Sequence, residues 1–251
     1  MQRYFIEIAY NGSPYHGWQI QQNSLSIQEV LNHALQTILR HSVETTGSGR
    51  TDTGVHAKQQ FVHLDTHQKI TSRTIQSLNS ILPHEIAVKA IYSVDSDANA
   101  RFDAISRTYQ YLIHFKKNPF LTHYSYQAIQ IPDLNDMSKA IELLKNYSDF
   151  EAFSKTNTQV KTNICKISEA TWKETENGIQ FEIKADRFLR NMVRAIVGTM
   201  LQVGNGTTSL DEFREIIESK NRTSAGFSVP ACGLYLTQVL YPNGFLKNKI
   251  D

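Results

Sequence analysis

Two successive runs of strand-like and helix-like hydrophobic pattern constrain the fold of this 251-residue chain most strongly. Apolar residues at every second position predict half-buried strands, and apolar residues at steps of three and four predict helices. The first run predicts strands at 3–10, 59–64 and 86–94 and helices at 26–39 and 71–82. The second run predicts strands at 108–115, 165–175, 179–184 and 234–240 and helices at 135–147, 187–203 and 210–219. This order is typical of an α+β architecture with two similar halves.

Local signals support single elements of these runs. Ser26 and Glu29 predict a capping box at the start of the first helix. Asn177 and Gly178 predict the turn of a hairpin. The pattern restarts near residues 103–106, so we expect an N-terminal half at 1–104 and a C-terminal half at 105–251.

Composition and charge exclude several classes of protein. Hydrophobic residues make up 40% and charged residues 20%, as in a soluble globular protein. No apolar run approaches the roughly 20 residues of a membrane helix, and residues 1–10 alternate like a strand instead of forming a signal peptide. The two cysteines, Cys165 and Cys232, do not indicate a disulfide framework, so we expect a cytoplasmic protein.

Positive charge is concentrated at one place rather than abundant. The formal net charge is only +2, which is weak support for nucleic-acid binding. A local cluster, opposed only by Asp186, consists of Lys184, Arg187, Arg190 and Arg194. At about 100° per residue, the three arginines would fall within roughly 60° of each other on the predicted helix. Such a helix face predicts an anionic neighbour, either a carboxylate or an RNA phosphate.

Segment 47–57, with the sequence GSGRTDTGVHA, is expected to form a glycine-rich loop. Three glycines in eight residues disfavour a helix or strand interior because glycine loses much backbone entropy there. The loop holds one carboxylate, Asp52, and one guanidinium, Arg50. A nearby arginine keeps an aspartate ionised, and such a carboxylate can act as a nucleophile, a base or an electrostatic stabiliser. An Asx-turn, in which Asp52 only caps amides of its own loop, fits the composition equally well.

This loop, followed by Phe61-Val62-His63-Leu64, resembles the catalytic motif of the TruA-type tRNA pseudouridine synthases. Other segments are similar to further parts of the family, in the same order and over nearly the whole chain: 10–19, 26–29, 100–111, 188–198 and 233–236. The sequence departs from the family pattern at Thr53, where many members carry alanine, and at Arg190, where related sequences carry histidine.

The resemblance implies a fold and a reaction. The implied fold is the pseudouridine synthase fold, a largely antiparallel mixed sheet with helices on one side. The implied reaction isomerises uridine to pseudouridine at positions 38, 39 and 40 in the anticodon stem-loop of tRNA. The bond from C1′ to N1 breaks and the uracil rejoins through C5, after the base has been flipped out at a cost of a few kcal/mol. Members of the family are homodimers, and the reaction requires no metal, redox or nucleotide cofactor.

The resemblance also assigns roles to individual residues. Asp52 would attack uracil or ribose, or take a ribose proton, and the sequence leaves all three open. Tyr109 matches the active-site tyrosine under the flipped base, where stacking is worth about 1–3 kcal/mol; a core tyrosine beside Tyr111 is the alternative. Arg194 is the expected partner of Asp52, and Arg50 is the second candidate. Four further arginines are expected to contact the substrate or to serve the structure: Arg101, Arg107, Arg187 and Arg190.

Two other functions compete with this interpretation. Asp52-Thr53-Gly54 is the tripeptide of aspartic proteases, but their chemistry needs two such aspartates and this chain has one. A non-catalytic RNA-binding module would explain the arginines but not a lone carboxylate, which RNA phosphates repel. His63 and His67 have the spacing of a zinc pair, but no cysteine pair accompanies them, and we expect no metal.

Overall fold

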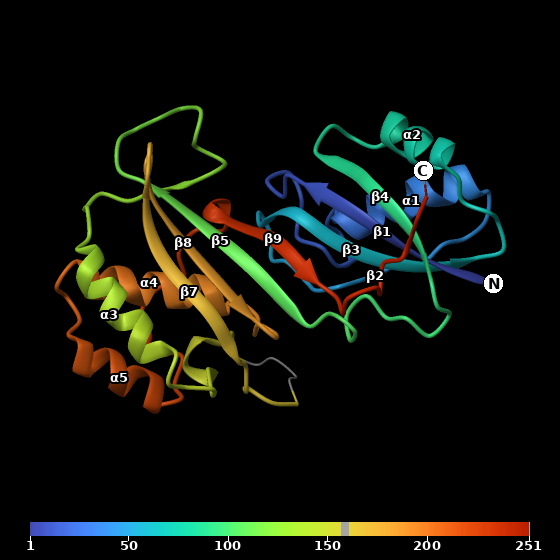
Figure 1. The fold of residues 1–251 in the computed structure, drawn as a ribbon. Helices are drawn as coiled ribbons and strands as arrows, with labels where there is room; N and C mark the ends of the chain where they lie inside the picture. The colour runs from blue at the N-terminus through green and yellow to red at the C-terminus, as the bar shows by residue number, and fades with distance from the viewer. Residues whose placement is uncertain (157–160, 251) are drawn as a thin grey trace. The chain divides into compact units, whose positions relative to one another are not determined.

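The computed structural model describes residues 1–156 and 161–250, and they form two compact units (Figure 1). Unit 1 consists of residues 1–107 and the segment from residue 235 onward, and unit 2 consists of residues 108–234. The two halves expected from the sequence were 1–104 and 105–251. The C-terminal segment is counted with unit 1 because Tyr235 and Leu236 pair in parallel with His56 and Ala57.

Unit 1 is built on strands in the order β10-β4-β1-β3-β9. Its strands are β1 (Gln2–Tyr10), β2 (Thr46–Gly47), β3 (His56–Thr66), β4 (Ile86–Val94), β9 (Leu234–Leu240) and β10 (Asn248–Lys249). Strand β1 pairs antiparallel with both β3 and β4, and the two-residue strand β2 pairs antiparallel with β3. Two helices belong to this unit, α1 (Ile27–Leu39) and α2 (Ser72–Ile81), and α2 packs against β4 and α1.

Helix α1 shows why the sequence pattern located its elements well. The Ser26 hydroxyl accepts a hydrogen bond from the Glu29 amide at 3.3 Å, which satisfies a donor that the helix itself leaves unpaired. The helix ends at Arg40, whose φ of 54° is left-handed. Its buried face consists of Ile27, Leu31, Ala34, Leu35 and Leu39, which follow the helical spacing of apolar residues.

The core of unit 1 includes residues from both ends of the chain. Tyr241 makes edge-to-face contacts with Phe5 at 5.4 Å and with Phe61 at 5.3 Å between ring centroids. Its hydroxyl donates to the carbonyl oxygen of Ala100 at 2.6 Å, and burial raises its pKa. Aromatic pairs of this kind stabilise a fold by about 0.5–1.5 kcal/mol beyond the contribution of the buried area. The segment after β9, which contributes Tyr241, is therefore part of the core of unit 1.

Unit 2 contains strands in the order β5-β8-β7 and three α-helices that gather beside β7 and β8 (Figure 1). Its elements are β5 (Ser106–His114), β6 (Tyr126–Gln127), α3 (Leu134–Leu144), η1 (Glu151–Phe153), β7 (Ile167–Thr175), β8 (Gly178–Ala185), α4 (Met192–Gly204), α5 (Leu210–Glu218) and η2 (Ala231–Gly233). Strands β7 and β8 form the expected antiparallel hairpin, but its turn is one residue earlier than expected: Glu176 and Asn177 make the turn, and Gly178 begins β8 and pairs with Thr175.

The predicted α+β class with a mostly antiparallel mixed sheet is confirmed. Two pairs among the described residues, β3–β9 and β5–β6, are parallel. One helix prediction is wrong at its start: 187–203 was expected, and α4 begins at Met192. The preceding residue, Asn191, has a left-handed φ of 68°, which asparagine tolerates better than most residues and which a helix interior cannot contain.

Candidate active site

The glycine-rich loop lies between β2 and β3 and turns the chain back on itself. Gly47 pairs with Val62, and the Ser48 amide donates to the carbonyl oxygen of Phe61 at 2.7 Å. Farther along, the Val55 amide donates to the Asp52 carbonyl at 3.1 Å, and Gly54 has a φ of 78°. Glycine suits this turn because a side chain would strain a left-handed residue.

Within this loop, exposure differs from residue to residue. The side chain of Asp52 is partly exposed, those of Arg50 and Thr53 are exposed, and Thr51 is buried. The loop therefore places the Asp52 carboxylate at the surface of unit 1, while the preceding residue, Thr51, is buried. A substrate can reach a carboxylate in this position.

A second loop, residues 11–18, packs directly against this one. The Trp18 amide donates to the Thr51 carbonyl at 3.1 Å, and the Gly12 amide donates to Nδ1 of His56 at 3.2 Å. A Cβ on Gly12 would lie 1.9 Å from the Val55 carbonyl oxygen, and a Cβ on Gly17, whose φ is 89°, would lie 2.6 Å from the Thr51 carbonyl oxygen. The approach is therefore closer than any residue other than glycine permits.

The aromatic residues of the second loop are part of the packing. Tyr15 and Trp18 are 3% and 2% exposed, and burial raises the pKa of Tyr15. Trp18 also faces Gly47, where a Cβ would lie 2.7 Å from the indole ring. These two side chains therefore pack inside unit 1 and support the loop with Asp52. They are not exposed for contact with RNA.

Three buried polar side chains also hold the loop. The Tyr10 hydroxyl lies 2.8 Å from Oγ1 of Thr51 and donates to Oε1 of Gln60 at 2.8 Å. The Gln60 amide nitrogen donates to the Gly49 carbonyl oxygen at 3.3 Å. The sequence analysis did not identify Tyr10 and Gln60 as residues that hold this loop. The signal that could have indicated Gln60 was a glutamine at an inward-facing position of a strand.

The side chain of Arg107 makes hydrogen bonds that stabilise unit 1. Its guanidinium donates to three carbonyl oxygens, those of Ala104 at 2.9 Å, Ser48 at 2.9 Å and Arg101 at 2.6 Å. Arg107 thus ties the start of the loop with Asp52 to the segment before β5. Arg101 is exposed and its guanidinium lies 5.5 Å from the ring of Phe102, which is 77% exposed.

Tyr109 lies in unit 2 on β5 and is partly buried. Its ring meets the ring of Phe188 edge to face, with centroids 5.0 Å apart and planes at 84°. Tyr111, two residues along the strand, is fully buried, donates from its hydroxyl to the Pro230 carbonyl at 2.7 Å and has a pKa that burial raises. The core role considered for Tyr109 therefore belongs to Tyr111, while Tyr109 keeps part of its ring accessible.

The three arginines of the expected helix face lie in different environments. Arg194 is in the first turn of α4, and its Nε donates to the Val229 carbonyl at 2.7 Å. Arg187 and Arg190 precede the helix, so the shared helix face was wrong. Arg187 donates to the Thr162 carbonyl at 3.0 Å, and Arg190 is exposed.

Helix α4 and the segment 226–229 are closely packed, which fixes the backbone beside Arg194. A Cβ on Gly198 would lie 1.8 Å from the Phe227 carbonyl oxygen. The Gly226 amide donates to Oγ1 of Thr199 at 3.0 Å, and the Val229 amide donates to the Arg194 carbonyl at 3.2 Å. The guanidinium of Arg194 is thus held at one end by a rigid neighbour.

Of the histidine pair considered for zinc, His63 has a defined place in the core, and the described residues contain no group of three or more potential metal ligands. His63 is buried, and its Nδ1 accepts a hydrogen bond from the Ala100 amide at 3.1 Å. Its ring stacks on Phe5 at 5.9 Å, and burial, reinforced by Arg3, lowers its pKa. It is a structural histidine of the core.

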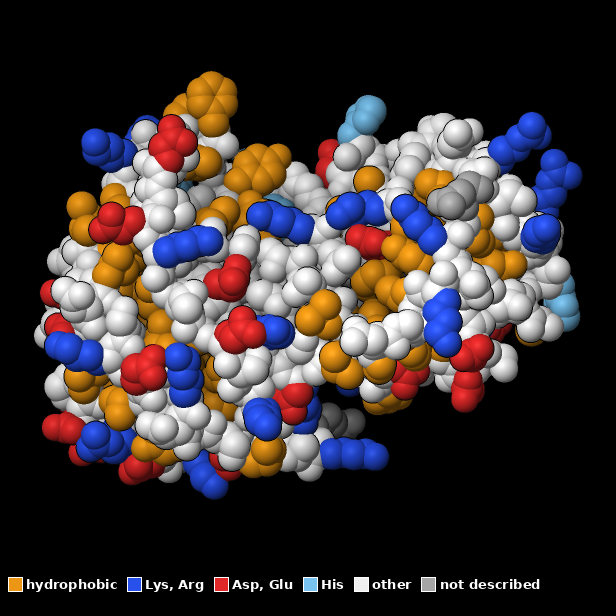
Figure 2. All heavy atoms as spheres, in the orientation of Figure 1, with side chains coloured by type: hydrophobic (Ala, Val, Ile, Leu, Met, Phe, Trp, Pro, Cys, Tyr) orange, Lys and Arg blue, Asp and Glu red, His pale blue; other side chains and the backbone are white. Residues whose placement is uncertain are grey.

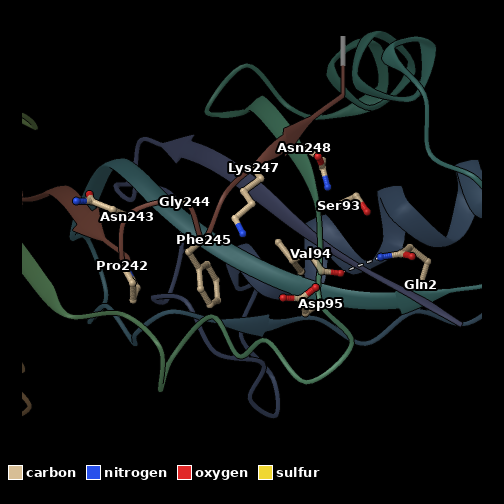
Figure 3. Close-up of a pocket in the computed structure, with 10 residues that line it drawn as sticks. All are labelled: Gln2, Ser93, Val94, Asp95, Pro242, Asn243, Gly244, Phe245, Lys247 and Asn248. Carbon is tan, nitrogen blue, oxygen red and sulfur yellow. Dashed lines mark hydrogen bonds between the residues drawn. The ribbon is translucent and has the colours of Figure 1, made fainter.

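A pocket of about 420 Å³ lies in unit 1 between the C-terminal segment and the ends of β1 and β4 (Figure 3). Gln2 and Val94 line it, joined by a hydrogen bond of 2.9 Å, and the side chain of Lys247 points into it. Gln2 begins β1, whereas Tyr10, which contacts the loop with Asp52, ends it. The pocket is therefore remote from the candidate site.

None of the helices in the described residues is long and apolar enough to cross a membrane.

Comparison with known proteins identifies the class of this protein, an RNA-modifying isomerase, and its family. A family model described as tRNA pseudouridine synthase matches residues 7–103 and 140–242. The chain therefore belongs to the tRNA pseudouridine synthase family, and the prediction of an enzyme that isomerises uridine in tRNA is confirmed.

Individual relatives match over almost their full length. A protein named tRNA pseudouridine synthase A from Bacteroides fragilis is 51% identical over 96% of this chain and 97% of its own. One of the same name from Bacteroides thetaiotaomicron is 49% identical over 96% and 91%, and one from Bacillus subtilis is 38% identical over 94% and 98%. These relationships support the synthase over the protease and the non-catalytic RNA-binding module.

Proposed function

We propose that the chain converts uridines 38, 39 and 40 in the anticodon stem-loop of tRNA to pseudouridine, with Asp52 as the catalytic carboxylate. The observation that carries the proposal is a partly exposed carboxylate on a loop whose neighbours Thr51 and Val55 are buried and hydrogen-bonded. The motif resemblance of residues 47–57 and the family relationship support the same assignment.

The reaction needs few groups, and the chain offers them. The bond from C1′ to N1 breaks, the uracil turns, and a bond from C1′ to C5 forms while C5 loses a proton and N1 gains one. Asp52 initiates this exchange, and Tyr109 provides the aromatic face for the flipped base. Arg194 and Arg50 are the guanidinium groups that the motif resemblance assigns to this carboxylate as partners.

Tritium release from tRNA labelled at C5 of uridine tests the activity. We expect release with purified protein, and nucleotide-resolution mapping should find pseudouridine missing at positions 38–40 in tRNA from cells that lack it. Release without loss at those positions would contradict the proposed target sites but not the reaction. The absence of release from any tRNA would contradict the proposed function itself.

We also propose that the protein acts as a homodimer in the cytoplasm. The resemblance supports the dimer, and so do exposed apolar side chains around the segment between β6 and α3 and the loop before it: Phe120 at 85%, Ile129 at 98% and Ile131 at 76% exposure. Hydrophobic side chains also project from unit 2 in Figure 2. Both cysteines are free thiols, which supports a reducing compartment.

Tyr109 gives a prediction about stacking. Tyr109→Phe keeps the aromatic face and should bind tRNA as well as the wild type, whereas Tyr109→Leu should lose most of its single-turnover activity because about 1–3 kcal/mol of stacking is lost. Tyr111→Phe is the matched control on the same strand: it should lower the melting temperature and leave the rate unchanged. Normal turnover by Tyr109→Leu would contradict the stacking role.

Arg194 gives a prediction about the chemical step. Arg194→Ala should lower the single-turnover rate at saturating tRNA, whereas Arg187→Ala should mainly weaken binding and reduce the salt slope by about one unit. The pair is matched because both arginines donate to backbone carbonyls of a segment distant in sequence: Arg194 to Val229, and Arg187 to Thr162 and Ile164. Single-turnover rates and binding constants at several salt concentrations separate the two effects. If Arg194→Ala changed only affinity and its salt slope, Arg194 would be a phosphate contact.

A further inference from the structure

We infer that a buried hydrogen-bonded chain, formed by Tyr10, Thr51 and Gln60, positions the loop that carries Asp52 for catalysis. The inference rests on the proposed role of Asp52 and adds positioning residues that touch neither substrate nor reacting atoms. All three side chains are buried, with exposures of 5%, 8% and 0%. They come from β1, from the loop itself and from β3.

In each of these hydrogen bonds, the donor and the acceptor can be assigned from the adjacent bond. The Gln60 side-chain nitrogen donates to the Gly49 carbonyl, so the Gln60 oxygen faces Tyr10. The Tyr10 hydroxyl therefore donates to Gln60, and because it has only one proton, it accepts from the Thr51 hydroxyl at 2.8 Å. The hydrogen-bonded chain thus runs from the Thr51 hydroxyl through the side chains of Tyr10 and Gln60 to the Gly49 carbonyl.

The two ends of this chain are loop residues on either side of Arg50, and Thr51 directly precedes Asp52. Its two interior members stand on the rigid strands β1 and β3. A register shift lies between Ile8 and Tyr10 in the pairing of these strands: Ile8 opposes Gln60, and Tyr10 opposes Ala57. Irregularities of this kind re-aim side chains next to active sites, and here Tyr10 reaches the loop.

The loop is thereby fixed by side chains as well as by backbone. The Trp18 amide holds the Thr51 carbonyl, while Tyr10 holds the Thr51 side chain, so residue 51 is restrained on two sides. A residue held in this way cannot rotate its backbone without breaking buried hydrogen bonds, and such breaks are costly. The orientation of the next residue, Asp52, follows from that restraint.

The test uses paired tyrosines of the same strand. Tyr10→Phe removes the central hydroxyl, and Tyr4→Phe is its control, because Tyr4 is also on β1, is also 5% exposed and has a hydroxyl that accepts from the Ile70 amide at 3.4 Å. We expect Tyr10→Phe to slow the single-turnover rate by about tenfold to a hundredfold with KM nearly unchanged, because a misplacement of about 1 Å can cost a hundredfold. Tyr4→Phe should lower the melting temperature comparably and keep the rate.

A second variant tests whether the hydroxyls act as one chain. Thr51→Val should slow the reaction, and the Tyr10→Phe/Thr51→Val double variant should be no slower than the slower single variant, since both changes break the same chain. Independent, multiplying losses would overturn the inference.

The result for Asp52→Asn in the same assay distinguishes this inference from the proposed function. A normal rate for Tyr10→Phe beside an inactive Asp52→Asn would overturn the positioning role alone. An Asp52→Asn variant that kept its turnover would remove the proposed role of Asp52, and the positioning role would fall with it.

Discussion

Asp52→Asn and Asp52→Ala are expected to lose turnover by about a thousandfold or more while keeping the fold and tRNA binding. The expectation follows from the lone carboxylate of the loop, since no other acidic residue occurs between Gly47 and Ala57. Asparagine preserves the shape and hydrogen-bonding reach of the side chain but carries no charge and is a poor nucleophile and base. Single-turnover tritium release measures the loss, and unchanged tRNA affinity shows that it lies in the chemical step.

Asp186→Asn is a suitable control for the loss of one negative charge. Asp186 is exposed in unit 2 beside the cluster of basic residues, and its carboxylate accepts from the amides of Lys166 and Arg187. Its substitution should change tRNA affinity more than the rate. Residual activity of an Asp52 variant above roughly a tenth of the wild type would exclude Asp52 as the catalytic group.

Gly12→Ala is expected to destabilise the protein by about 1–3 kcal/mol and to remove most of the activity. The new Cβ would lie 1.9 Å from the Val55 carbonyl oxygen, so one of the two packed loops has to move. The Val55 amide closes the turn on the Asp52 carbonyl, and movement of Val55 therefore displaces the catalytic loop. Denaturant unfolding and single-turnover assays measure the two effects.

Gly49→Ala provides the matched control, because a Cβ at Gly49 meets no atom within 4 Å. The same substitution should there leave activity intact and change the free energy of unfolding by no more than about 1 kcal/mol, the usual size when glycine is replaced at a compatible position. Equal stability of the two variants would show that the loop of residues 11–18 yields easily and does not hold the loop with Asp52.

Several elements could be predicted closely because their signals are local. Strands β4 and β9 were placed at 86–94 and 234–240, as observed, since period-two patterns bounded by turns determine them. The start of α4 could not be predicted, because the apolar pattern continues through residues 188 and 189 and only the left-handed backbone of Asn191 interrupts it. Hydrophobic periodicity contains no information about such a single dihedral angle.

The candidate site was only partly accessible to sequence reasoning for a different reason. Glycine content and a lone acid mark the loop with Asp52 directly. The residues that hold the loop are distant in sequence: Tyr10 contacts Thr51 across 41 positions, and Arg107 reaches Ser48 across 59. Arg107 therefore looked like a possible phosphate contact, although the structure commits its guanidinium to backbone carbonyls. Long-range hydrogen bonds of this kind require coordinates.

The division of the chain also has a consequence for its synthesis on the ribosome. Unit 2 is continuous from residue 108 to residue 234, so its whole sequence is available before Tyr235 has been made. Unit 1 is interrupted, and Phe5 and Phe61 lack their contacts with Tyr241 until residue 241 has left the exit tunnel. Closing so long a loop is slow relative to local pairing. The unit that begins the chain is therefore completed last, after a nascent period in which its aromatic core stands partly open.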